Sequence, residues 1–205
     1  EFADSRFQVL SELTRLRQLC CDPALVYENY EGGSAKLDLC IELIQSAVES
    51  GHKILLFSQF TSMIEILTAR LQEESISCFV LQGSTKKEQR AQMVEQFNRD
   101  DTSVFCISLK AGGTGLNLTG ADIVIHYDPW WNVAVENQAT DRAHRIGQKN
   151  VVTVYKLIAK GTIEEKIIKL QQMKKELAEE ILSGDEIKTA SFQREELLEL
   201  LEERF

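Results

Sequence analysis

The chain has 205 residues, 43% of them hydrophobic, and no apolar run approaches the roughly 20 residues that cross a bilayer. Its N-terminus lacks the basic and then apolar pattern of a secretory signal, so we expect an intracellular protein, nuclear or in a bacterial or archaeal cytoplasm. The net charge of −9 does not exclude a nucleic-acid partner, because residues 1–50 and 161–205 each carry −5 whereas residues 51–160 carry +1.

The first expected element is an amphipathic helix that ends near Asp22-Pro23. Leucines recur in it at every third position, at Leu10, Leu13, Leu16 and Leu19. A loop through Gly32 and Gly33 follows, and we take residues 1–33 as a lead-in helix and linker. Ser34 can then cap a second helix over residues 35–50.

From residue 53 onward, short apolar runs alternate with segments of helical character. The expected strands are 53–57, 78–81, 104–109, 122–127 and 151–158, and the expected helices are 62–74, 85–98 and 132–145. Strands that are apolar at nearly every position are typical of a sheet covered on both faces. The pattern therefore predicts an α/β fold over residues 34–160, with a parallel sheet flanked by helices.

After Gly161 the sequence becomes that of long charged helices. Thr162 and Glu165 have capping-box spacing for a helix that reaches about Leu182. Its apolar positions are Ile163, Ile167, Leu170 and either Met173 or Leu177, and we expect them to pack back on the sheet. An acidic helix over about 193–204 is expected to follow.

A glycine-rich segment, SLKAGGTGLNLTGAD (108–122), separates two expected strands. The gap is too short for a crossover helix, so a dinucleotide-binding fingerprint at Gly113 and Gly115 does not fit its context. A tight loop remains, whose backbone N–H groups and Thr114 hydroxyl can meet a phosphate. The alternative is an ordinary glycine-rich turn.

The segment QATDRAHRIGQ (138–148) places Gln138, Arg142 and Arg145 within two helical turns. At a spacing of three residues, the two arginines are expected to share one helical face. One interpretation is a solvated face with a weak Asp141–Arg145 pair. The other is a pair of planar cations directed at a triphosphate that another domain holds.

Two adjacent tryptophans follow Pro129 in HYDPWWN (126–132). At a strand end, one ring can join the core while its neighbour, Trp131, faces outward as a contact surface; packing of both rings is the alternative. The five cysteines are scattered, odd in number and without zinc-ligand spacing, so we expect reduced thiols and no metal site.

The chain contains neither GxxxxGK[ST] nor an acidic DExx segment after a strand. A protein without the loop that cradles the β and γ phosphates, and without the metal-binding acid, does not hydrolyse ATP alone. Any catalytic role must therefore be exercised together with another lobe.

Seven ordered segments resemble the Snf2 family of superfamily 2 helicase-like ATPases, over nearly the whole chain. They are LTRLRQLCCDP (13–23), GSAKLDLC (33–40), ILLFSQFTSMIEIL (54–67), LQGSTKKEQR (81–90), SLKAGGTGLNLTGAD (108–122), ATDRAHRIGQ (139–148) and GTIEEKIIKLQ (161–171). The resemblance implies the C-terminal RecA-like lobe, with residues 161–205 forming the brace and acidic helices. It implies closure of this lobe over ATP and Mg bound mainly by an N-terminal RecA-like lobe.

The resemblance also assigns site residues. Arg142 and Arg145 match the family's arginine fingers, Gln138 matches the first position of the same motif, and Gly113 and Gly115 lie near the nucleotide. Residues that match the family's contacts to the backbone of duplex DNA are Ser58, Gln59, Gly83, Ser84, Thr85, Lys110 and Thr114, and Trp131 matches a tryptophan near the DNA groove. Such contacts bind phosphates and are steeply salt dependent.

Two other functions compete with a translocase on duplex DNA. A strand-separating or RNA helicase shares the RecA-like lobe, but the RAHRIGQ ending and the brace helix favour the Snf2 type. A non-catalytic interaction module, binding a partner through its acidic helices, is the other alternative, and the intact arginine pair argues against it.

Overall fold

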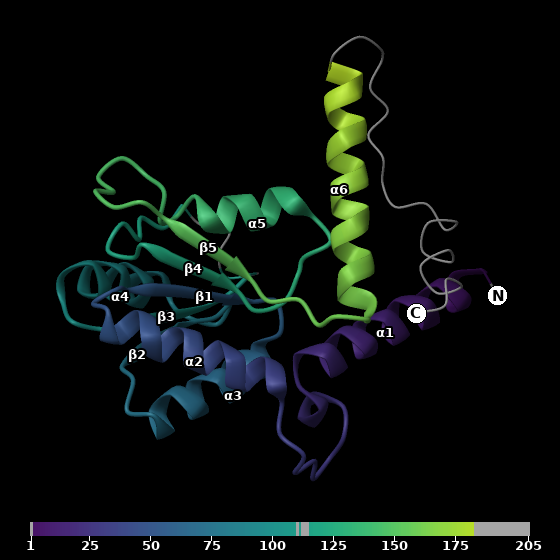
Figure 1. Ribbon diagram of the computed structural model, residues 1–205, viewed down its shortest axis with the longest axis horizontal. Coiled ribbons are helices and arrows are strands. Elements are labelled where there is room, and N and C mark those ends of the chain that lie inside the picture. Colours follow the sequence, from purple (N-terminus) through teal and green to yellow (C-terminus); the bar gives the residue numbers. More distant parts are fainter. Residues whose placement is uncertain (1, 110, 112–114, 183–205) are drawn as a thin grey trace.

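The computed structural model describes residues 2–109, 111 and 115–182, and Figure 1 shows a sheet between helices with α1 and α6 beside it. In chain order the elements are α1 (Phe2–Cys21), the short η1 (Pro23–Leu25), α2 (Ala35–Glu49), β1 (Ile54–Ser58), α3 (Thr61–Glu73), β2 (Cys78–Leu81), α4 (Lys87–Arg99), β3 (Val104–Ser108), β4 (Ile123–His126), α5 (Val133–Thr140), β5 (Thr153–Lys156) and α6 (Ile163–Leu182). The acidic helix expected over 193–204 lies outside the described residues.

The five strands form one parallel sheet in the order β2-β3-β1-β4-β5. Ile54 of the central strand β1 pairs with Val104 of β3 on one side and with Ile123 of β4 on the other. Every residue of β1, β3 and β4 is buried, as continuous apolar runs require. The predicted α/β fold is therefore confirmed.

Helices cover both faces of the sheet (Figure 1). On one face, Leu56 packs in a core with Ile44 of α2 and Leu67 of α3. On the other face, Phe105 packs against Phe97 of α4, with 5.3 Å between the ring centroids. Two hydrophobic cores thus fix the strand ends from which the site loops leave.

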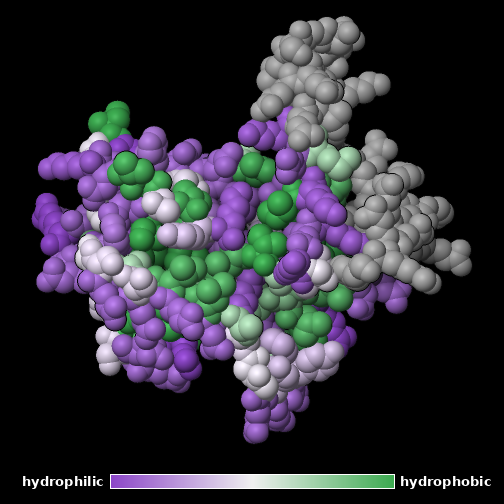
Figure 2. All heavy atoms as spheres, in the orientation of Figure 1, coloured by the Kyte–Doolittle hydropathy of each residue, from purple (hydrophilic) through white to green (hydrophobic). Residues whose placement is uncertain are grey.

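The edge strand β5 is less covered than the rest of the sheet. All four of its residues are exposed, Val154 and Tyr155 among them. Figure 2 shows hydrophobic side chains gathered near the centre of the face that carries β5 and α2. One apolar edge of the sheet is therefore accessible in the described part of the chain.

The helices α1 and α6 form a third, small core with each other. Leu13, Ile163 and Ile167 are buried together, with Trp131 and Leu170 packed against them. The expectation that α6 packs on the sheet is therefore wrong: its apolar side chains pack on α1.

Among the described residues, no helix is long and apolar enough to span a membrane.

The expected leucine stripe of α1 is also corrected. Leu13 is buried, but Leu10 and Leu16 are 51% and 41% exposed. A strict spacing of three residues drifts by about 60° per step around a helix of 3.6 residues per turn, so these leucines cannot all face one side.

Candidate functional site

The residues that the sequence singles out gather at the carboxyl edge of the parallel sheet. Ser58 ends β1, Ser108 ends β3, and Asp128 follows β4 by two residues. Ligands of open α/β sheets bind outside the carboxyl ends of the strands. The edge therefore brings together loops that are far apart in the sequence.

The loop between β2 and α4 carries three of the predicted DNA contacts. Gly83 and Ser84 are exposed, and the Thr85 hydroxyl accepts a hydrogen bond from the Gln82 N–H (3.1 Å). Arg90 organises this loop, because its guanidinium donates at 2.8–3.2 Å to the backbone carbonyls of Thr85, Ala111, Gly83 and Gln82. Sequence reasoning missed Arg90, although its segment was among those matched to the family.

The glycine-rich loop is described in part. Lys110, Gly113 and Thr114 lie outside the described residues. Asn98 of α4 holds the rest of the loop, donating to the Asn117 carbonyl (2.8 Å) and accepting from the Gly120 N–H (2.9 Å). The space at Gly120 is tight, because a Cβ atom there would lie 2.9 Å from Asn98 Oδ1 and 3.1 Å from its Cα, so a side chain would require the neighbouring chain to shift.

The helix expected over residues 132–145 ends earlier, at Thr140. Beyond Thr140, backbone carbonyls accept hydrogen bonds from residues outside the helix. The Leu118 N–H donates to the Arg142 carbonyl (3.0 Å), and the Gln148 side-chain amide donates to the Ala143 carbonyl (3.1 Å). The segment after Thr140 is therefore a series of turns tied to the glycine-rich loop.

The two arginines in these turns differ in exposure, because Arg142 is 2% exposed whereas Arg145 is exposed. The prediction that they share one helical face is therefore wrong. Arg145 donates from Nη1 to the Gly115 carbonyl (3.2 Å) and from Nε to the Asp141 carbonyl (3.2 Å). Burial, and after it the positive charge of Arg145, lowers the pKa of Arg142. Two such neighbouring cations favour an anion beside them. Gln138 is exposed on α5.

Ser58 and Gln59 at the end of β1 are organised by Asp128. The buried Ser58 hydroxyl donates to Asp128 Oδ1 (2.5 Å), and the Gln59 N–H faces the same carboxylate at 3.3 and 3.4 Å from its two oxygens. Burial raises the pKa of Asp128, and the Ser58 hydrogen bond opposes this shift. Gln59 Nε2 is a buried donor with no partner among the described residues. Ser58 is thus directed inward, whereas Gln59 retains an unused donor.

The two tryptophans follow β4 and pack in different cores. Trp130 packs on the sheet face that holds Phe105, and Trp131 packs on the small core of α1 and α6. Both rings are partly buried. The guanidinium of Arg17 lies 5.1 Å from the Trp131 ring centroid. The role of Trp131 in contact with DNA stays a prediction.

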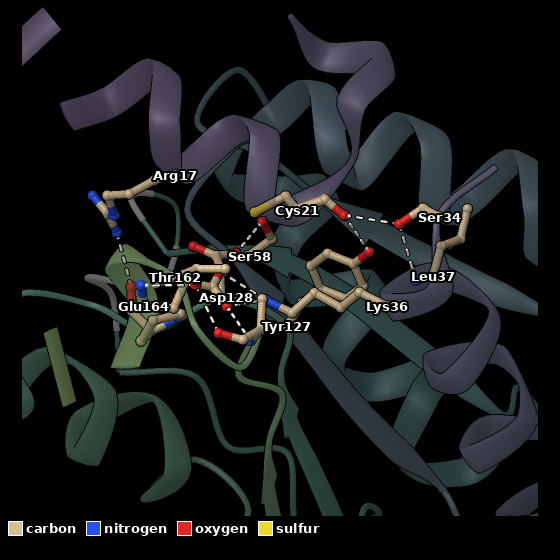
Figure 3. Close-up of polar contacts among 12 residues, drawn as sticks. Arg17, Cys21, Ser34, Lys36, Leu37, Ser58, Tyr127, Asp128, Thr162 and Glu164 are labelled. Atoms are coloured by element: carbon tan, nitrogen blue, oxygen red, sulfur yellow. Dashed lines mark hydrogen bonds and ion pairs between the residues drawn. The ribbon is translucent and has the colours of Figure 1, made fainter. Parts of the chain in front are cut away.

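A network of buried polar groups lies behind this edge (Figure 3). Lys36 of α2 contacts both carboxylate oxygens of Glu164 in α6, each at 2.7 Å, and their side chains are 9% and 1% exposed. Burial raises the pKa of Glu164, whereas the nearby Lys36 charge lowers it. The Tyr127 hydroxyl donates to the Cys21 carbonyl at the end of α1 (2.8 Å). Sequence reasoning missed these partners, because the pattern of one segment does not show which distant residue it meets.

Comparisons with known proteins agree with this architecture. Residues 35–147 match the family described as "Helicase conserved C-terminal domain". The chain is 45% identical over 202 residues to an uncharacterized ATP-dependent helicase of Mycoplasma pneumoniae. The aligned region covers 97% of this chain and 19% of that protein. It is 43% identical over 169 residues to the chromatin-remodeling ATPase INO80 of Homo sapiens. This aligned region covers 82% of the chain and 11% of that protein. The chain thus spans a fifth or less of the length of these relatives.

A solved structure extends the agreement to three dimensions. The Sulfolobus solfataricus SWI2/SNF2 ATPase core in complex with double-stranded DNA superposes with a TM-score of 0.70 and 38% sequence identity, covering 86% of this chain and 38% of that one. The sheet order, the turns that carry Arg142 and Arg145, and these matches lead to one assignment. The chain belongs to the helicase conserved C-terminal domain family, as the C-terminal RecA-like lobe of a Snf2-type ATPase.

Proposed function

We propose that this chain is the second motor lobe of a DNA-stimulated ATPase that translocates on duplex DNA and remodels or displaces the proteins bound there. The observation that carries the proposal is the contact between Arg145 and the Gly115 carbonyl. It places a permanently charged, exposed guanidinium on the glycine-rich loop, next to the buried cation of Arg142. An anionic partner brought by another domain would relieve the repulsion between these two cations.

The residues present fit the terminal phosphates of ATP. Arg145 offers a planar fork that can bind two phosphate oxygens at once. Bound ATP with Mg would supply the free energy of hydrolysis. Arg142 and Arg145 would stabilise the negative charge that develops, and Gln138, which is exposed on α5, would contact the nucleotide. Mg would be held mainly by the first lobe, as the resemblance to the Snf2 family implies.

The duplex would bind across the same sheet edge by its phosphates. Gly83 and Ser84 are exposed in the loop that leads into α4, whose first backbone N–H groups favour an anion. The buried Nε2 of Gln59 would have to turn outward to reach a phosphate. Such contacts position the protein on DNA without selecting a sequence, and binding weakens as salt rises.

The test compares this chain alone with a polypeptide that carries it behind a Walker A-containing RecA-like lobe. We expect no ATPase activity from the chain alone, and duplex-stimulated turnover with displacement of a third strand from a triplex by the two-lobe protein. Robust turnover by the chain alone would contradict the shared site. Unwinding of a forked duplex would indicate a strand-separating helicase, and a two-lobe protein without ATPase activity would indicate an interaction module.

A further inference from the structure

Residues 128–132, within the loop that connects β4 to α5, are held by side chains from outside the family-matched segment 35–147. Arg17 of α1 donates from Nη2 to the Pro129 carbonyl (2.8 Å), and Gln171 of α6 donates to the carbonyl of the next residue, Trp130. Two successive carbonyls of one loop are thus bound from the two flanking helices. We call residues 128–132 the tryptophan loop.

Arg17 also contacts the ring that follows these carbonyls. Its guanidinium carbon lies 5.1 Å from the Trp131 ring centroid and 5.8 Å from that of Phe60, which follows the Ser58-Gln59 pair. Arg17 is 5% exposed, and burial lowers its pKa while the charge of Asp128 raises it. Burying a cation is unfavourable unless it is paired and hydrogen bonded. The contacts of Arg17 with the Pro129 carbonyl and the Trp131 ring therefore hold its side chain against the tryptophan loop.

Gln171 ties the other end of the loop to α5. Its amide also donates to Glu136 Oε2 (3.0 Å), a carboxylate of α5 that contacts Lys156 of β5 at 3.3 Å. Gln171 and Glu136 are 7% and 1% exposed. The start of α5, the tryptophan loop and α6 are therefore connected by a single buried amide.

We infer that Arg17 and Gln171 are positioning residues for Trp131, and that α1 and α6 together set the place of the tryptophan loop at the carboxyl edge of the sheet. The lobe defined by residues 35–147 supplies the loop, but the flanking helices decide where its ring lies. The consequence for DNA rests on the proposed function, whereas the placement of Trp131 does not.

The placement is measured on this chain with the substitution Trp130→Phe, which leaves Trp131 as the only tryptophan, so that its emission can be excited selectively over that of the tyrosines. Arg17→Met should shift the emission of Trp131 to the red and raise its acrylamide quenching constant by roughly twofold, because the cation on the ring and the carbonyl contact are both lost. Arg17→Lys, which keeps the charge without the fork, should give part of the shift. Arg15→Met, at an exposed arginine of the same helix, is the matched control and should change neither quantity.

Circular dichroism establishes that each variant is folded, and Gln171→Met provides a second, uncharged route to the same effect. Unchanged Trp131 emission and quenching in folded Arg17→Met and Gln171→Met would overturn the inference and leave both residues a purely structural role. If Arg17→Met does not fold, Arg17→Lys and Gln171→Met decide by the same criterion.

The consequence for DNA is measured as the duplex concentration that half-maximally stimulates ATPase activity of the two-lobe protein. Arg17→Met should raise it roughly tenfold, the loss expected for one stacked contact, and should add nothing in a Trp131→Ala background. An equal rise in both backgrounds would show that Arg17 does not act through Trp131. A shift in fluorescence without any change in the DNA requirement would leave the positioning intact and contradict the DNA site of the proposed function.

Discussion

Arg145 Nη1 lies 3.2 Å from the carbonyl oxygen of Gly115, although the two residues are 30 positions apart. The contact ties the turns after α5 to the glycine-rich loop after β3, two segments that were assigned separately to a nucleotide site. Arg145 is therefore held at the glycine-rich loop while remaining exposed.

Gly120→Ala should destabilise the chain by about 1–3 kcal/mol. The new Cβ atom would lie 3.1 Å from Asn98 Cα, so the backbone of α4 or of the glycine-rich loop has to shift. The matched control is Gly83→Ala, where a Cβ atom meets nothing within 4 Å. Urea unfolding of the two variants measures the difference, and equal midpoints would show that the loop relaxes freely.

Glu164→Gln should lower the free energy of unfolding by about 3 kcal/mol, because it leaves the Lys36 ammonium buried without its counter-charge. The ion pair Arg99–Glu95 provides the comparison, since its side chains are 78% and 62% exposed. Glu95→Gln should cost less than about 1 kcal/mol. Similar losses in the two variants would mean that the Lys36–Glu164 pair is no more than a solvated contact.

His126 should make the chain sensitive to acid. Burial, and then the nearby Lys156 charge, lowers the pKa of His126 from 6.5 to about 4. As the pH falls below 6.5, His126 becomes protonated in the unfolded chain but stays neutral in the folded chain until about pH 4. The contribution of neutral His126 to the free energy of unfolding is therefore complete above pH 6.5 and is lost between pH 6.5 and 4. The loss amounts to about 3 kcal/mol for this group.

The comparison with His126→Gln isolates this effect, because the raised pKa values of Asp128 and Glu164 act in the opposite direction and are common to both proteins. The free energy of unfolding of wild type should decline relative to the variant between pH 6.5 and 4. Parallel curves would show that His126 is protonated in the folded chain as readily as in the unfolded chain.

The sequence predicts the sheet well because β1, β3 and β4 are short, apolar at almost every position and separated by helical segments, which is typical of strands buried on both faces. It does not predict where α5 ends, because Thr140 is followed by turns whose carbonyls bind Leu118 and Gln148, and no local signal marks those partners. Pairs such as Arg17 with Pro129 arise only when the chain is folded.

In the proposed function, Arg145 acts on the terminal phosphate of ATP held between two lobes. We expect Arg145→Ala in the two-lobe protein to reduce duplex-stimulated turnover by roughly 10³ to 10⁵, with a far smaller change in ATP affinity, because an arginine finger stabilises charge that develops in the transition state. Arg145→Lys should restore little, since lysine carries the charge without the planar fork. Arg99→Ala, at an exposed arginine of α4, is the control and should leave turnover unchanged.

The direct measurement is therefore turnover and ATP affinity of Arg145→Ala and Arg145→Lys side by side. We expect a large loss of turnover in both variants, with ATP still bound. Turnover like that of wild type in both variants would contradict the assignment of Arg145 and, with it, the motor function proposed for this lobe.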